Sequence, residues 1–384
     1  MNKIHDVIVI GGGPSGLNTA SLLAEKGQDV LLLEKKKEIG HKVICSGIVG
    51  REAFERFDLP ASLAVSKIQD VRMISPFGTQ LRYQHPDAFA YVVDRNLFDK
   101  SLAARVMDNG GRIECGCQVH DIQLNNGQVD VLSEGKRGER TMSSARVAVV
   151  ATGVNQYLNK KVGLGSAKAL LNGVQTEVEV EDSGVTTILF GNRVAPGVFA
   201  WAVPVGKTRM RVGLLTNRDP RAYFEKLLEK MLPDTTVKID KDQIKFKSIV
   251  QGAQTKTFAD RILAVGEAAG QVKTTTGGGV YYGLLCSQLA VQTILKNSAS
   301  GTYSAGHLAE YEKLWKKAIL KEIVVGYYTR KVCAQLNDSQ IERLFLLAKN
   351  NGIFPYIKEN GNFDFHGDLL LDLARKAPVL RSFF

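Results

Sequence analysis

The sequence has few cysteines and no long apolar segment. Its five cysteines are scattered over 384 residues, without a CxxC pair or the spacing of a zinc or iron–sulfur site, so we expect no metal. No stretch approaches about 18 uninterrupted apolar residues, the length that a membrane-spanning helix needs. The first ten residues lead into a strand pattern rather than a signal peptide. These absences indicate a cytoplasmic protein with free thiols.

Positive charge prevails without being concentrated. Lysine and arginine number 50 against 39 acidic residues, for a net charge of +11. The basic residues are spread along the chain and form no nucleic-acid-binding module, so we expect no nucleic-acid partner. Two alternatives stay open. The charge can attract an anionic membrane surface, which places the protein on the inner face of the membrane, or it belongs to a generally basic soluble protein.

The first 34 residues have the pattern of a dinucleotide-binding unit. Residues 4–10 are an apolar run typical of a buried parallel strand, and a GxGxxG set follows at once in residues 11–16. Residues 17–26 have helical periodicity, residues 30–33 form a second apolar strand, and Glu34 stands at its end. A lone GxGxxG is weak evidence, but this order of elements is the context that the motif requires.

Each residue of this unit has a physical role in binding a dinucleotide. Gly11 permits the tight turn, Gly13 lets the backbone approach a pyrophosphate, and Gly16 lets the helix pack close to the strand. The free N–H groups at the start of the helix, with their partial positive charge, favour phosphates. Glu34 can accept hydrogen bonds from ribose hydroxyls.

Different kinds of segment alternate along the rest of the chain. Short strands in 65–90 and period-2 alternation in 169–254 predict an antiparallel sheet, whereas 91–168 and 255–300 return to helices and buried strands. The sequence predicts an α/β fold with three parts: a Rossmann-like nucleotide-binding domain built from discontinuous segments (1–64, 91–168 and 255–300), an inserted antiparallel-sheet substrate domain (65–90 and 169–254) and a helical C-terminal region (301–384).

A second glycine cluster indicates that the nucleotide is a flavin. Glu267 follows a buried strand, and Gly277-Gly278-Gly279 open a predicted helix. A carboxylate at a strand end can accept hydrogen bonds from ribitol or ribose hydroxyls. A glycine-opened helix aims N–H groups at an anionic centre, which a reduced flavin has and a nicotinamide lacks.

Together these stretches resemble the geranylgeranyl reductase family of FAD-dependent enzymes, part of the p-hydroxybenzoate-hydroxylase-like flavoprotein group. The matching stretches cover about residues 1 to 300: 11–16 with Glu34, Cys45-Ser46-Gly47, Asp94-Arg95 with Phe98-Asp99, Ala151-Thr152-Gly153, 199–204 with Val212-Gly213, and 266–270 with 277–279. Four positions depart from the family pattern. Phe199 replaces the usual tyrosine, Val203 a phenylalanine, Glu267 an aspartate and Thr274 a proline.

The resemblance implies that FAD is bound in an extended form by the glycine turns and by named contacts. The implied cofactor-binding residues are Gly11, Gly13, Ser15, Gly16, Glu34, Cys45, Ser46, Ile48, Arg95, Val119, Gly153, Glu267, Gly279 and Val280. Arg95 can fork onto the pyrophosphate, with a surface helix cap as its alternative. For Val119 a plain core position is an equal alternative.

The resemblance also places Cys45 beside the flavin and one strand over it. Reduction of an isolated C=C bond needs a proton and a hydride, and the Cys45 thiol can supply the proton while flavin N5 supplies the hydride. A wall of the flavin pocket is an equal alternative for Cys45. Phe199, Trp201 and Pro204 are the expected substrate-binding residues. Phe199 and Trp201 share a strand face with Val203 that lines a lipid tunnel or a sandwich core.

The implied activity is saturation of C=C bonds in a prenyl chain carried by an isoprenoid lipid, a quinone or a prenyl diphosphate. An external reductant, either NAD(P)H or a ferredoxin-like protein, reduces the flavin. Two other classes stay open. One is a flavin-dependent monooxygenase or halogenase, whose Trp-x-Trp-x-Ile-Pro box is similar to residues 199–204; the other is a membrane-peripheral electron-transfer flavoprotein.

Three basic or apolar features have competing interpretations. Lys207, Arg209 and Arg211 alternate along a predicted strand and face either a phosphate headgroup or, as we favour, solvent. A basic amphipathic helix over 307–331 lies on a membrane, covers the tunnel or, as we favour, packs on the domain. The apolar residues 380–384 dock or insert.

Overall fold

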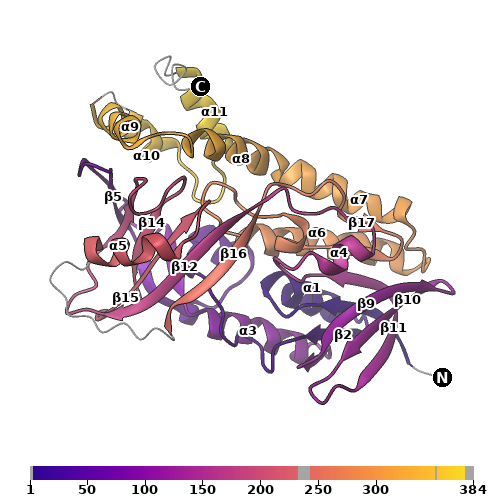
Figure 1. Cartoon of the computed structure of the whole chain (residues 1–384). Coiled ribbons are helices and arrows are strands. Elements are labelled where there is room, and N and C mark those ends of the chain that lie inside the picture. Colours follow the sequence, from indigo (N-terminus) through magenta and orange to yellow (C-terminus); the bar gives the residue numbers. More distant parts are fainter. Residues whose placement is uncertain (1–2, 232–242, 351–352, 377–384) are drawn as a thin grey trace.

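The computed structural model describes residues 3–231, 243–350 and 353–376 as two large sheets, a small third sheet and a set of helices (Figure 1). The mixed α/β architecture with a helical C-terminal region confirms the predicted fold class. The strand and helix predicted for residues 4–26 are β1 (Ile4–Ile10) and α1 (Pro14–Glu25). The predicted apolar residues 380–384 lie outside the described residues.

An eight-stranded sheet is built around β1. β1 pairs in parallel with β2 and β11, β2 with β8, and β11 with β18, as the apolar runs predicted. The strand order is β17 (Phe258–Ala259), β18 (Ile262–Ala264), β11 (Arg140–Val150), β1, β2 (Val30–Glu34) and β8 (Arg112–Cys115), with β9 (Gln118–Asn125) and β10 (Gln128–Glu134) paired antiparallel beside β11.

Both faces of this sheet are buried. Val7 and Val9 face a core with α1, α3 (Arg95–Asp108) and α6 (Val280–Ser298), whereas Ile8 and Ile10 face a second core that includes Leu158 of α4 (Tyr157–Lys161). Alternate side chains of one strand therefore serve two cores, which explains the continuous apolar run in β1.

The second large sheet has seven strands. One face packs on α5 (Arg221–Met231), and the other carries Trp201, Val203 and Leu215. The strand order is β16 (Lys245–Gln251), β12 (Ala169–Glu179), β15 (Arg209–Thr216), β14 (Ala200–Pro204), β13 (Thr186–Leu189), β5 (Asp70–Ile74) and β6 (Gln80–Gln84). The pairs are antiparallel as predicted except β13 with β5, which is parallel because β5 comes from a distant part of the chain.

A small sheet of β3 (Ile48–Gly50), β7 (Ala90–Val93) and β4 (Ala64–Ile68) links the two large ones and was not predicted from the sequence. Val49 and Val93 belong to the core of the first sheet, and Ile68 and Val92 to the core of the second. The short helices η1 (Ala61–Leu63) and α2 (Arg51–Arg56) connect its strands. Alternate residues of one strand thus join both cores.

The predicted amphipathic helix over 307–331 is continuous in the structure. It comprises α7 (Ala305–Trp315), a π-helical turn (Lys316–Leu320) and α8 (Lys321–Cys333). Leu308, Tyr311, Trp315 and Ile319 are fully buried in the core that contains α1 and α6. This apolar stripe is therefore a packing surface, and it faces neither a membrane nor the tunnel. Ala318, which the pattern assigned to the stripe, is exposed.

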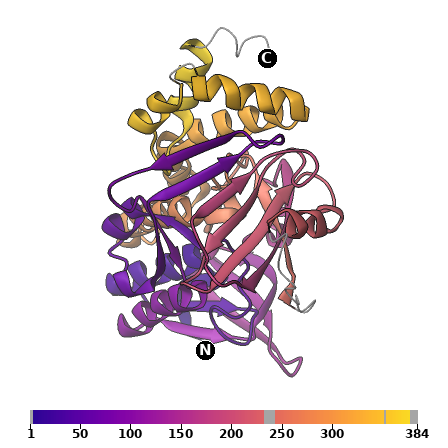
Figure 2. The same cartoon turned by 90° about the vertical axis from the view of Figure 1, so that its left-hand side faces the viewer.

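The remaining helices, α9 (Asp338–Asn350), α10 (Ile353–Asn360) and α11 (Gly367–Lys376), lie beyond the β5–β6 pair (Figure 2). Glu342 of α9 accepts hydrogen bonds from the Ser75 and Thr79 hydroxyls and the Phe77 N–H, which attaches α9 to the turn between these strands. Within the described ranges, every helix is too short or too polar to cross a bilayer.

Trp315→Ala should lower the free energy of unfolding by about 3–5 kcal/mol, since the side chain is fully buried and its Nε1 donates to Thr257 Oγ1 at 2.9 Å. Tyr328→Ala, on the same continuous helix but 59% exposed, should change it by about 0.5 kcal/mol or less. Urea unfolding followed by circular dichroism measures both. Equal losses for the two variants would contradict this packing.

Candidate functional site

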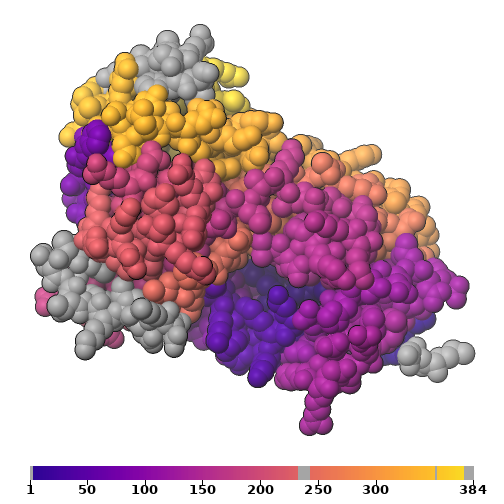
Figure 3. Space-filling view, viewed as in Figure 1, coloured from indigo at the N-terminus to yellow at the C-terminus, as the bar shows by residue number. Residues whose placement is uncertain are grey.

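A cavity of about 1020 Å³ lies between the two large sheets. On the face of the molecule drawn in Figure 3, a recess has indigo N-terminal residues at its bottom. Most of the site residues expected from the sequence line it. These are Gly11, Gly13, Ser15, Glu34, Cys45, Ser46, Ile48, Arg95, Val119, Gly153, Phe199, Trp201, Glu267, Gly279 and Val280. Gly16 and Pro204 are not among the lining residues.

The first glycine turn brings the start of α1 to the cavity. Gly11 has φ +114°, in the region that favours glycine, and a Cβ on Gly16 would lie 2.0 Å from the Gly11 carbonyl oxygen. Gly13 is the N-cap of α1, and a Cβ there would meet no atom of the described residues within 4 Å. The helix start is therefore open to the cavity, and its N–H groups are available to a phosphate.

Glu34 is held in place by backbone N–H groups. Its carboxylate accepts hydrogen bonds from Gly12 at 2.6 Å and Lys36 at 2.8 Å, and the residue is buried. Both oxygens keep unused lone pairs, because each has one backbone donor. A ribose hydroxyl that reaches the cavity wall here would meet a fixed acceptor.

The second glycine cluster meets the first at Ser15. A Cβ on Gly266 would lie 2.2 Å from Ser15 Oγ, and one on Gly283 of α6 would lie 2.3 Å from the same atom. Gly279 is the N-cap of α6, so both helices begin at the cavity. Both glycine clusters therefore line the same cavity.

Glu267, in the turn η3 (Gly266–Ala269), joins the cavity to the second sheet. Its carboxylate accepts a hydrogen bond from the Val250 N–H at 3.2 Å and lies 3.6 Å from Lys247 Nζ. Gly153 lies opposite, where a Cβ would be 3.5 Å from Glu267 Oε2. The carboxylate is thus oriented at the cavity wall, and its role as an acceptor of hydroxyl groups stays a prediction.

Arg95 is buried at the first position of α3. It forms an ion pair with Asp99 at 2.6 Å, and its Nε finds no hydrogen-bond partner among the described residues. Burial acts to lower the pKa of Arg95, but Asp99 and Cys45 outweigh it, so its pKa lies above the ordinary value. The cavity wall therefore carries a permanent cation with an unused donor, which fits an anionic ligand such as a pyrophosphate.

Cys45 lies in the loop between β2 and β3, with its Sγ accepting a hydrogen bond from the Gly47 N–H at 3.4 Å. Burial raises the pKa of the thiol, but Arg95, Lys247 and that hydrogen bond outweigh it, and the pKa lies below its ordinary value. Such a thiol releases its proton readily. Its assignment as the proton donor stays a prediction.

The apolar part of the cavity is wider than the sequence indicated. Trp201 packs against Gly213, where a Cβ would lie 2.5 Å from the indole, and Phe199 stacks edge-on to it. Pro204 falls on the other side of β14, because side chains alternate along a strand. Lining residues that the sequence did not single out are Met73, Tyr83, Phe89, Ile188, Leu215, Phe354, Ile357 and Phe363.

These missed residues fall into two groups, one with a signal in the sequence and one without. Met73, Tyr83 and Ile188 belong to short strands whose alternation was visible, so their shared face with Trp201 was accessible in principle. Phe354 and Phe363 come from the helical C-terminal region, which folds over the cavity from more than a hundred residues away. Local sequence carries no signal of that contact.

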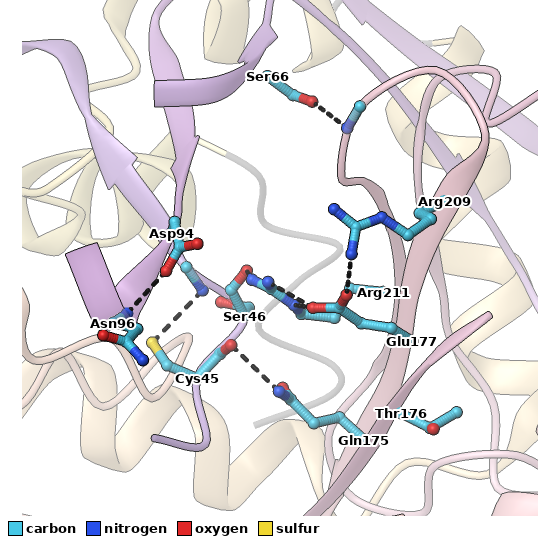
Figure 4. Close-up of polar contacts among 12 residues, drawn as sticks. Cys45, Ser46, Ser66, Asp94, Asn96, Gln175, Thr176, Glu177, Arg209 and Arg211 are labelled. Carbon is cyan, nitrogen blue, oxygen red and sulfur yellow. Dashed lines mark hydrogen bonds and ion pairs between the residues drawn. The ribbon is translucent and has the colours of Figure 1, made fainter. Parts of the chain in front are cut away.

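The basic residues of β15 require a correction. Arg211 was expected to face solvent or, in the other interpretation, a headgroup, but it is buried and bound to Glu177 (Figure 4). Lys207 and Arg209 are exposed as expected. Gln175 of β12 is also buried, because the loop that carries Cys45 covers it.

Comparisons with known proteins show the family to which the chain belongs. The family model described as lycopene cyclase protein matches residues 6–347. A digeranylgeranylglycerophospholipid reductase of Methanocaldococcus jannaschii is 30% identical over 358 residues, which covers 90% of this chain and 90% of that protein.

Two solved structures share the fold. A geranylgeranyl bacteriochlorophyll reductase-like protein from Thermoplasma acidophilum has a TM-score of 0.87 at 21% identity and covers 100% of both chains. The flavin-dependent brominase Bmp2 has a TM-score of 0.75 at 15% identity and covers 98% of this chain and 100% of its own. At these identities the likeness concerns the fold alone.

Alkylation of cavity thiols should separate Cys45 from Cys117. Both line the cavity, but burial and Glu114 raise the pKa of Cys117, whereas Arg95 helps to lower that of Cys45. Iodoacetamide labelling at a series of pH values, read by peptide mass spectrometry, should give a midpoint for Cys45 below that of an ordinary thiol and one for Cys117 above it. Arg95→Met should move the Cys45 midpoint to higher pH. The same Cys45 midpoint in the unaltered protein and in Arg95→Met would contradict this account.

Proposed function

Since the chain belongs to the lycopene cyclase protein family and is 30% identical to a named reductase over most of its length, we propose that it is an FAD-dependent reductase of prenyl-chain double bonds. Its family and relatives make it a flavin-dependent oxidoreductase. The proposal adds two points. The flavin is FAD, and the substrate is a prenyl chain on an isoprenoid lipid, a quinone or a prenyl diphosphate.

One observation carries it: a polar nucleotide cradle and an apolar wall belong to the same cavity. The helix starts at Gly13 and Gly279 and the cation of Arg95 suit a pyrophosphate and an anionic ring, and Glu34 suits a ribose. The apolar wall around Trp201 suits a hydrocarbon chain and excludes water from it. The residues present therefore fit FAD together with a lipid.

In this proposal, FAD held by the glycine turns and Arg95 would supply the hydride chemistry when bound and reduced. The protein supplies the rest. The wall around Phe199 and Trp201 holds the chain, and the acidic thiol of Cys45 delivers a proton to one carbon of the double bond. After the proton has left, Cys45 is a thiolate, and the positive charge of Arg95 stabilises it.

The reductant and the location belong to the same proposal. The GxGxxG context occurs once in the sequence and is used by the flavin cradle, so an external donor, NAD(P)H or a ferredoxin-like protein, reduces the flavin. A prenyl lipid resides in a membrane, so we propose a cytoplasmic protein that takes its substrate from an anionic membrane surface, which the net charge of +11 favours.

The activity is tested by anaerobic incubation of the reduced protein with a geranylgeranylated glycerophospholipid. Mass spectrometry should show a gain of two hydrogen atoms for each double bond reduced. Cys45→Ala should slow the reaction by about 10²-fold or more, as expected for loss of a positioned acid. Cys333→Ala, an exposed thiol of α8, should leave the rate unchanged. Absence of any mass gain over a panel of prenyl lipids, quinones and diphosphates would remove the proposal.

A second prediction concerns the cofactor. Glu34→Gln keeps an acceptor for the Gly12 N–H but removes the charge, so the affinity for FAD should fall by about tenfold. Glu25→Gln, an exposed acid at the end of α1, is the matched control and should not change it. Fluorescence titration of the apoprotein with FAD measures both. Equal affinities for the two variants would show that Glu34 does not contact the ribose.

A further inference from the structure

The loop that carries Cys45 is held by side chains of the second large sheet. Gln175 Nε2 donates to the Cys45 carbonyl oxygen at 3.2 Å, and Arg211 Nη1 donates to the Ser46 carbonyl oxygen at 2.5 Å. Figure 4 shows both carbonyl groups on the side of β12 and β15, and the sulfur of Cys45 on the opposite side, toward Asp94. The loop is thus fixed by its backbone while its thiol is left to face Arg95.

The two donors are set by strand pairing. Glu177 of β12 lies opposite Arg211 of β15 in the antiparallel register, and Gln175 is two residues before Glu177, on the same face. Glu177 Oε1 accepts from Arg211 Nε at 3.0 Å and from Nη2 at 2.7 Å. The fork of the guanidinium is therefore oriented by the carboxylate, which leaves Nη1 to the loop.

Gly47 is needed for this contact. A Cβ on Gly47 would lie 2.6 Å from Arg211 Nη1 and 2.7 Å from the Val93 carbonyl oxygen, and its φ is +78°. The loop also receives a hydrogen bond from the Val93 N–H to the Gly47 carbonyl oxygen at 2.8 Å. The loop therefore lies between the third sheet and the second large sheet, with no space for a side chain at residue 47.

We propose that Arg211 and Gln175 are positioning residues that hold the Cys45 thiol in register with the flavin and the prenyl chain. This inference rests on the proposed function, because it assigns to the second sheet the placing of the proton donor. Both side chains are buried, at 7% and 8% exposure, and the charge of Arg211 is neutralised by Glu177. Arg211 therefore acts on the loop rather than on a headgroup in solvent.

Arg211→Met and its neighbour Arg209→Met form a matched pair. Arg209 is on the same strand and reaches the same Glu177 at 3.5 Å, but it is exposed and makes no contact with the loop among the described residues. Arg211→Met, measured at saturating FAD, should lower kcat for prenyl reduction by about 10²-fold, as expected when a reacting group shifts by about 1 Å. Arg209→Met should behave as the unaltered protein, and Arg211→Lys should recover part of the rate.

The second readout is the pH midpoint for iodoacetamide labelling of Cys45, which needs no substrate. It should rise in Arg211→Met, because a released loop moves the thiol away from Arg95, and stay unchanged in Arg209→Met. Gln175→Leu, which removes the other donor, gives the same test if Arg211→Met fails to fold. Identical midpoints and rates in the Arg211 and Arg209 variants would overturn the inference. If the unaltered protein reduces no prenyl chain, the proposed function is removed. The labelling midpoints would still show whether Arg211 positions the Cys45 thiol.

Discussion

The site depends on the close contact of backbone with backbone at the start of α1. Gly16 lies so near the Gly11 carbonyl oxygen that any Cβ would collide with it, and the backbones of Gly266 and Gly283 lie as close to the Ser15 hydroxyl. These contacts bring the N-termini of α1 and α6 to one cavity, where their dipoles add. Side chains at these glycines would hold the two helices apart, and the cavity would lose its positive end.

The second sheet contributes the other half of the site. Its face toward the cavity is apolar at Trp201 and Leu215 and polar at Gln175 and Arg211. The apolar part suits a hydrocarbon chain, and the polar part holds the backbone of the loop at Cys45. In our proposal one sheet thus shapes the substrate space and fixes the group that donates the proton, which ties substrate fit to the chemistry.

Electrostatics around Cys45 follow from the same arrangement. The thiol lies against Arg95, and Arg95 is kept charged by Asp99, so burial does not make the thiol inert. Cys286, equally free but buried among apolar residues of α6, has its pKa raised well above the ordinary value. The two free cysteines differ because Arg95 and Lys247 offset the effect of burial on the pKa of Cys45, whereas burial alone acts on the pKa of Cys286.

The sequence by itself determined the two glycine turns that open onto the cavity. The order of strand, glycines, helix and acid in residues 4–34, and the second cluster at 266–279, are local patterns whose geometry follows from missing side chains and helix dipoles. Only the tertiary structure decided that Arg211 is buried against the loop at Cys45, that Phe363 reaches the cavity, and that the stripe at Trp315 is core. Each of these depends on which distant surface covers a residue, and alternation along a strand or helix shows that a face is apolar or polar without showing what lies against it.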